Sequence, residues 1–233
     1  GVLCPGRRTL THIYPFLDPV RRRAHDAYSR FFTDASWGLG DFWKCLAILV
    51  IKTLFPHGVI ETQLDDTAFH KSGRQIEGAS WWRDAVRSTA TKTVHCFGLN
   101  LLVLTVCVRA PWGGEPLGLP INLRLHRKGG ATLLQLAEEM IREVADWFPD
   151  RSFALCADGF YAPLAGADLP RTSLTSRMRS DAALYRPAPP RRPHQRGAPR
   201  KKGARLPTPA QLAARETSWK RIRVRVRGKP TVR

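Results

Sequence analysis

The stretch GGATLLQLAEEMIREVADWFPD, residues 129–150, decides how the strands around it can be arranged. Its apolar side chains recur every three or four residues, which predicts an amphipathic helix that begins near Thr132 and stops at Pro149. These side chains are Leu133, Leu136, Ala137, Met140, Ile141, Val144 and Phe148. Strand-like sequence lies on both sides, so we expect the helix to cross over between two strands of one sheet.

The sequence before this helix predicts an antiparallel meander of three strands, at residues 59–66, 95–109 and 117–125. After the helix, residues 152–157 (SFALCA) predict a short buried strand. A short helical or loop segment then leads to a further strand at residues 171–178. The expected fold is therefore α/β, a mixed sheet built in the order β-β-β-α-β-α-β.

The flanking regions differ from this core in composition. Apolar residues at helical spacing between residues 20 and 55 predict an N-terminal helical segment. Near the other end, SWKRIRVRVRG alternates strictly between Arg and apolar residues, which predicts a strand. We expect a helical segment at 1–57, an α/β core at 58–185, a basic Pro-rich linker at 186–209 and a strand-containing region at 210–233.

The positive charge of the chain is regional. Of the formal net charge of +19, residues 171–233 carry +17, because they hold 19 Lys and Arg against Asp181 and Glu216 alone. Cationic side chains that neutralise phosphates release condensed counterions, so this region is typical of a protein that binds nucleic acid. The alternative is a merely solvated tail.

The five cysteines are widely spaced and form no CxxC pair, and no Cys/His cluster has zinc-finger spacing. We interpret them as reduced thiols in a cytoplasmic protein. The longest apolar run, residues 45–55, is interrupted by Lys52 and is shorter than the ~20 residues of a membrane span, so no membrane association is expected.

Two adjacent carboxylates lie in LDDTAFHKSG, residues 64–73. If the crossover helix places the 152–157 strand parallel to the 59–66 strand, both strands end at the same edge, and Asp66 and Asp158 face each other. Like charges at short range repel, and a divalent cation such as Mg²⁺ removes that conflict. The alternative is that these are independent turn aspartates.

The segments LDDTAFHKSG, HCFGLNLLVL, RLHRKGG and ALCADGFYA together resemble the catalytic domain of bacterial insertion-sequence transposases of the DDE class, which has an RNase H-like fold. The resemblance covers about residues 25–230. It implies metal-dependent DNA cleavage and strand transfer with Mg²⁺ or Mn²⁺, in a bacterial cytoplasmic protein that binds DNA and forms a homodimer. Asp66 matches the first catalytic carboxylate and metal ligand and Asp158 the second, and Asp65 is the alternative if the register shifts by one.

The third carboxylate of that family, a Glu on a later helix, has no match. Glu216 is the only Glu after Glu143, and strand-like sequence follows it almost at once. We therefore expect the sequence to stop inside the insertion that precedes the third carboxylate, as a fragment would. Two alternatives to an active enzyme stay open: a non-catalytic nucleic-acid-binding protein, and a transposase remnant that binds DNA without cutting it.

We expect basic residues in three places to contact DNA. One follows the adjacent aspartates, others lie in the linker, and the rest form the row of Arg residues in the last strand. They are Lys71, Arg191, Arg192, Arg196, Arg200, Lys201, Lys202, Arg221, Arg223, Arg225 and Arg227.

Overall fold

The computed structural model describes residues 9–20, 22–36, 38–73, 75–110, 112–191, 197–215, 220–221, 223–226 and 229–232 of the 233-residue chain. Internal contacts divide the chain into two units, Gly1–Phe42 and Trp43–Arg233. Within the described residues, no helix has both the length and the apolar character needed to cross a bilayer.

The N-terminal part is helical, as predicted. Thr9 caps the first helix, its hydroxyl accepting a hydrogen bond from the backbone N–H of His12. Most of the last helix belongs to the second unit, where its Ala47 and Ile51 are part of the core. The helices are α1 (Leu10–Ile13), the 3₁₀ turn η1 (Tyr14–Phe16), α2 (His25–Thr33) and α3 (Leu39–Leu54).

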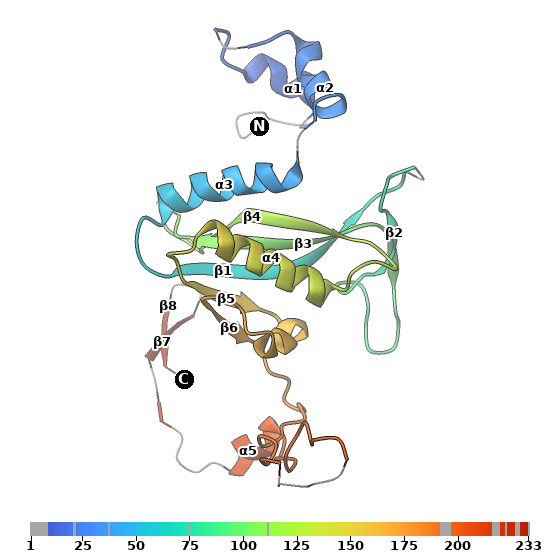
Figure 1. Ribbon diagram of the computed structural model, residues 1–233. Helices are drawn as coiled ribbons and strands as arrows, with labels where there is room; N and C mark the ends of the chain where they lie inside the picture. Colours follow the sequence, from blue (N-terminus) through green and yellow to red (C-terminus); the bar gives the residue numbers. More distant parts are fainter. Residues whose placement is uncertain are drawn as a thin grey trace. The chain divides into compact units, whose positions relative to one another are not determined.

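A mixed six-stranded sheet forms the centre of the second unit (Figure 1). The strand order is β2-β3-β1-β5-β6, and β4 pairs with β3 beside β2. The neighbours β1–β3, β2–β3 and β3–β4 are antiparallel, whereas β1–β5 and β5–β6 are parallel. The strands are β1 (Ile60–His70), β2 (Ser80–Arg83), β3 (His95–Val108), β4 (Leu117–His126), β5 (Phe153–Ala157) and β6 (Thr172–Ser176).

Helix α4 (Leu133–Trp147) is the predicted crossover. It begins with a capping box, in which Thr132 accepts from the backbone N–H of Gln135 and the Gln135 side chain accepts from the backbone N–H of Thr132. The helix lies against one face of the sheet (Figure 1). Because the crossover returns the chain beside β1, the predicted parallel pairing of β5 with β1 is confirmed.

Two details differ from the sequence-based expectation. Strand β1 continues past Asp66 to His70, because it stays paired with β3 as far as Gly98. The four-residue strand β2 was not expected, since SWWR is too short to show an alternating pattern. The segment before β6, expected to be helical or a loop, is a 3₁₀ helix, η2 (Gly159–Gly166), with Pro163 inside it.

The core lies between α4 and the sheet. Met140 and Val144 of α4 are buried with Leu64, Leu102 and Leu155 of the strands, and fully burying a side chain of this size contributes about 1.5–3 kcal/mol. A polar link joins the same layers at the edge, where the Asn122 amide and the Arg124 guanidinium of β4 both donate to the Glu143 carboxylate of α4.

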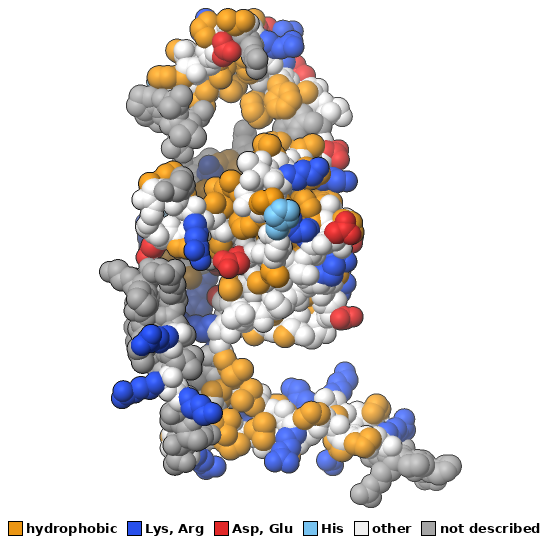
Figure 2. Space-filling model, turned by 90° about the vertical axis from the view of Figure 1, so that its left-hand side faces the viewer, with side chains coloured by type: hydrophobic (Ala, Val, Ile, Leu, Met, Phe, Trp, Pro, Cys, Tyr) orange, Lys and Arg blue, Asp and Glu red, His pale blue; other side chains and the backbone are white. Residues whose placement is uncertain are grey.

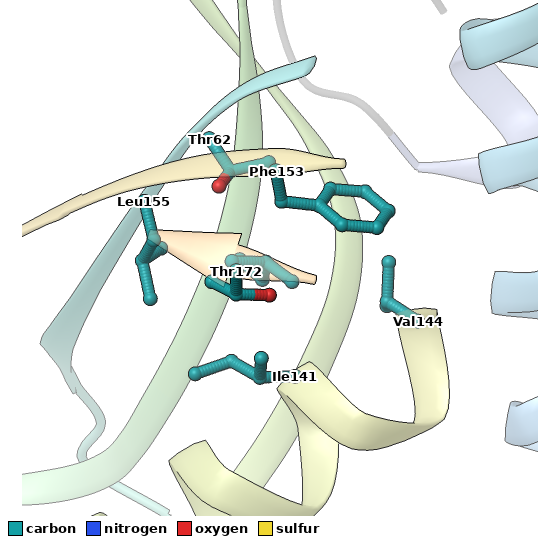
Figure 3. A pocket seen from close by; sticks show the side chains of 7 residues that line it. Thr62, Ile141, Val144, Phe153, Leu155 and Thr172 are labelled. Carbon is teal, nitrogen blue, oxygen red and sulfur yellow. The ribbon is translucent and has the colours of Figure 1, made fainter. Parts of the chain in front are cut away.

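A small gap remains in this core, between Ile141 and Val144 of α4 and Phe153, Leu155 and Thr172 of the parallel strands (Figure 3). Its volume is about 10 Å³, and its lining is mostly apolar, so it offers no room for a small-molecule ligand.

The basic C-terminal region contains regular structure in its described parts. A short bridge joins Tyr185 to Arg205, and the backbone N–H of Arg186 donates to Ala204. A strand is present where the alternating Arg pattern predicted one, and it pairs in antiparallel fashion with a second strand. The elements are α5 (Pro209–Arg215), β7 (Arg223–Val226) and β8 (Lys229–Val232).

We predict that Gly98→Ala destabilises the protein, by about 1–3 kcal/mol or more. A Cβ at Gly98 of β3 would lie 1.9 Å from the backbone oxygen of Phe69 in β1, so the two paired strands would have to separate. The measurement is chemical denaturation of the variant and the wild type.

Gly166→Ala is the matched control, because a Cβ at Gly166 meets nothing within 4 Å. Equal unfolding free energies for Gly98→Ala and the wild type would contradict the close approach of β1 and β3.

Candidate active site

The two aspartates of LDDT point to opposite faces of the sheet. Side chains alternate along β1, so that Ile60, Thr62 and Leu64 are buried toward α4 while Glu61 and Gln63 are exposed. Continuing this alternation, Asp66 lies half-buried on the α4 face and Asp65 is exposed on the other face. The two carboxylates therefore face different surroundings.

Strand β5 brings Asp158 beside Asp65. The last paired residues of the parallel strands are Leu64 and Ala157, and the next residue of each segment is an aspartate, Asp65 within β1 and Asp158 directly after β5. Asp158 keeps an extended backbone (φ −72°, ψ 176°), which continues the direction of β5. Residues in register on parallel strands point to the same face, so both carboxylates project from the face away from α4.

Electrostatics agrees with this placement. The pKa of Asp65 is raised, chiefly because neighbouring atoms partly shield its carboxyl group from water and further by the negative charges of Asp66 and Asp158. A hydrogen bond from the backbone N–H of Asp66 to the Asp65 carboxylate, 2.9 Å long, opposes part of this effect. Three carboxylates thus interact electrostatically near the C-terminal end of β5, which marks a candidate functional site.

Tyr161 connects Asp66 to the turn that follows Asp158. Its side chain is completely buried, and its hydroxyl donates a 3.0 Å hydrogen bond to Oδ1 of Asp66. Burial raises the pKa of the Tyr161 hydroxyl, and the charge of Asp66 and this hydrogen bond raise it further, so the group remains a proton donor. The Asp158 carboxylate itself accepts from the backbone N–H of Phe160 at 2.9 Å, fixing the start of η2.

Sequence reasoning missed the part played by Tyr161. The only signal was its position three residues after Asp158 in ADGFYA, and apolar and aromatic residues in such a turn are usually interpreted as core. His126 was missed in the same way. Burial lowers its pKa, although the nearby charge of Asp66 acts in the opposite direction.

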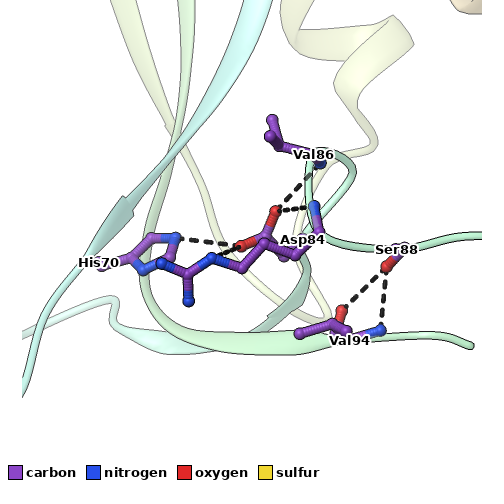
Figure 4. Close-up of polar contacts among 6 residues, drawn as sticks. His70, Asp84, Val86, Ser88 and Val94 are labelled. Atoms are coloured by element: carbon purple, nitrogen blue, oxygen red, sulfur yellow. Dashed lines mark hydrogen bonds and ion pairs between the residues drawn. The ribbon is translucent and has the colours of Figure 1, made fainter.

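A second group of potential metal ligands lies around the C-terminal end of β1. His70, Asp84 and Cys96 offer ligand atoms that all lie within 4.8 Å of one another, and we call these three residues the His–Asp–Cys cluster. Figure 4 shows the ion pair between His70 and Asp84, in which Nε2 and Oδ2 are 3.4 Å apart. The sequence did not reveal it, because the three residues come from separate segments with no motif spacing.

The expected DNA-contacting residues are only partly described. Lys71 follows β1 and is exposed, and its backbone N–H donates to Phe97 of β3. Around α5, at the bottom of Figure 2, blue Lys and Arg side chains are interspersed with apolar ones. Arg191, Arg200, Lys201, Lys202, Arg221 and Arg223 are exposed. Arg192, Arg196, Arg227 and the side chain of Arg225 lie outside the described residues, as does Glu216.

Comparison with known proteins identifies the family. Among the curated proteins and the solved structures, none matches the chain. A family model described as "DDE superfamily endonuclease" matches residues 1–231, nearly the whole chain. The chain therefore belongs to the family of DDE superfamily endonucleases.

Proposed function

We propose that this protein cleaves and transfers DNA strands as a transposase of the DDE class, with Asp65 and Asp158 as the first two metal ligands. Family membership implies a DNA substrate. The observation that supports the ligand assignment is the register of β1 and β5, which sets these two aspartates side by side on one face. The choice of Asp66 as first ligand stays a prediction, and the direction of its side chain favours Asp65 over it.

The donor set suits a hard cation. Asp65 and Asp158 offer carboxylate oxygens, which Mg²⁺ and Mn²⁺ prefer. The pKa of Asp65 is raised chiefly by desolvation, and the charges of Asp66 and Asp158, which a cation would neutralise, raise it further. Such ions, when bound, stabilise the attacking and leaving oxygens of a phosphoryl displacement. In this proposal Asp66 is a positioning residue, because its hydrogen bond from Tyr161 ties β1 to the turn that carries Asp158.

The sheet supports an RNase H-like fold. Strands β4, β3 and β1 are antiparallel neighbours, and β5 and β6 continue the sheet in parallel on the other side of β1, after the α4 crossover. This is the strand order that the resemblance to the transposases implies. The proposal assigns no third carboxylate, and a homodimer and a cytoplasmic location remain predictions.

The basic region from residue 171 onward is proposed to hold the DNA backbone. Its Arg and Lys side chains far outnumber its carboxylates, which are Asp181 and Glu216. Asp181 is already paired with Arg179 at 2.8 Å. Contacts of this kind carry little sequence information and depend strongly on salt. They position the duplex, while the carboxylates would act on it.

We predict that Asp158→Asn reduces Mg²⁺- or Mn²⁺-dependent nicking of supercoiled DNA by at least about 100-fold, because a direct ligand matters more than outer-shell partners, whose loss already costs about 10- to 100-fold. DNA affinity in the presence of a chelator should be unchanged. Asp146→Asn, on the exposed side of α4, is the matched control.

Binding of Mn²⁺ to the wild type, followed by calorimetry, provides a second readout that does not require turnover. If neither nicking nor Mn²⁺ binding distinguishes wild type from Asp158→Asn, the catalytic proposal is wrong and a DNA-binding protein without metal chemistry is the better description.

We predict that Asp65→Asn stabilises the metal-free protein at neutral pH. The folded-state pKa of Asp65 is raised, so the ionised carboxylate opposes folding above that pKa. The difference should shrink as the pH falls through the folded pKa and vanish below the ordinary value of about 3.9. Thermal unfolding across this pH range, with and without Mn²⁺, tests this. Added Mn²⁺ should stabilise the wild type more than the variant, and a destabilised variant at neutral pH would contradict the placement of Asp65.

We predict that replacing Arg200, Lys201 and Lys202 together by Ala lowers the slope of log affinity against log salt for duplex DNA, by up to about 0.9 for each phosphate that these side chains neutralise. Lys44, Lys52 and Lys92 replaced together are the control, since they remove the same charge at exposed positions outside the basic region. Equal slopes in the two triple variants would show that net charge, not this region, determines DNA binding.

A further inference from the structure

The His–Asp–Cys cluster is distinct from the Asp65–Asp158 edge. Strand pairing explains why its members meet: His70 of β1 pairs with Gly98, and Cys96 of β3 lies two residues before Gly98, so both point to the α4 face. Trp82 of β2 pairs with Cys96, and Asp84 follows two residues later on the same face. Asp65 and Asp158 project from the opposite face.

Two members of the cluster are buried. Asp84 is 6% exposed and Cys96 is 7% exposed, whereas His70 lies at the surface. Strands β1 and β3 therefore supply His70 and Cys96, Asp84 follows directly after β2, and the three side chains differ in chemical kind. An arrangement held by the backbone of a sheet is more rigid than one held by loops, which favours a defined coordination geometry.

The Asp84 carboxylate is already oriented. Its Oδ1 accepts hydrogen bonds from the backbone N–H groups of Val86 and Arg87, both 3.0 Å long (Figure 4). The hydrogen bond from Arg87 is the largest cause that lowers the pKa of Asp84, and the charges of Arg87 and His70 add to it. Its other oxygen, Oδ2, points toward His70 Nε2, so one oxygen closes the turn and the second remains available as a ligand.

We propose that His70, Asp84 and Cys96 bind a zinc-type transition metal ion, with the fourth position left to a water molecule. An imidazole nitrogen, a thiolate and a carboxylate suit Zn²⁺ far better than Mg²⁺. In a tetrahedral zinc site the nitrogen and oxygen ligands lie about 3.3 Å apart, and Nε2 of His70 and Oδ2 of Asp84 are 3.4 Å apart. The ion would join β1, β3 and the short edge strand β2.

Arg87 is the competitor for this position. Its Nε lies 3.6 Å from Oδ2 of Asp84, and its side chain is 67% exposed, so it can move into solvent when a metal binds. The simpler alternative is a His70–Asp84–Arg87 ion-pair group beside a buried thiol. Removing Arg87 distinguishes the two alternatives. In the metal site it would release the Asp84 carboxylate to bind the ion, whereas in the ion-pair group it would remove one of the interacting charges.

The experiment uses the whole chain, reduced and freed of metal with a chelator, and titrates it with Co²⁺ and Zn²⁺. We expect one equivalent to bind, with a thiolate-to-cobalt charge-transfer band and a higher melting temperature. Cys96→Ser should abolish the band and weaken zinc binding by more than about 100-fold, because it removes a direct ligand. Cys45→Ser, at an exposed position on α3, should preserve both.

Further variants keep the proposal falsifiable if Cys96→Ser folds poorly. His70→Ala changes a surface side chain and should weaken zinc binding similarly, whereas Arg87→Ala should tighten it. Asp158→Asn should leave zinc binding intact, which separates this site from the proposed catalytic edge. Failure to bind one equivalent, or binding that Cys96→Ser and His70→Ala leave unchanged, would overturn the proposal.

Discussion

The parallel pairing of β1 with β5 is the constraint on which the rest of the structure depends. Its register is set by apolar pairs, Ile60 opposite Phe153 and Leu64 opposite Ala157, whose side chains face α4. A slip of one residue would turn these side chains away from the core, so burial keeps the register. Two like charges are therefore held together by the hydrophobic core and in spite of their own repulsion.

Each face of the sheet then has its own role. On the α4 side the apolar core ends at the hydrogen bond between Tyr161 and Asp66, and the His–Asp–Cys cluster lies further along the same face. On the other side Asp65 and Asp158 are exposed. Because neighbouring strand residues alternate, the adjacent aspartates of one short motif serve both faces.

Much of the fold could be predicted because it follows from periodicity. The helix within residues 129–150 and the parallel pairing of β5 with β1 were both predicted from the sequence alone. Which of Asp65 and Asp66 lies on which face of the sheet could not be predicted. A shift of one residue in the strand register exchanges the two faces. The His–Asp–Cys cluster could not be predicted either, since its residues come from three separate segments and strand β2, which precedes Asp84, is too short to show a pattern.

The buried hydrogen bond of Tyr161 has a consequence for ion choice. It joins β1 to η2 and so restrains the segment that carries Asp65 from moving relative to the segment that carries Asp158. Mg²⁺ demands short, near-octahedral contacts, whereas Ca²⁺ is larger and accepts variable ligand numbers. In the proposed metal site, this link would favour the smaller ion, so that Tyr161 would influence ion selectivity without being a ligand.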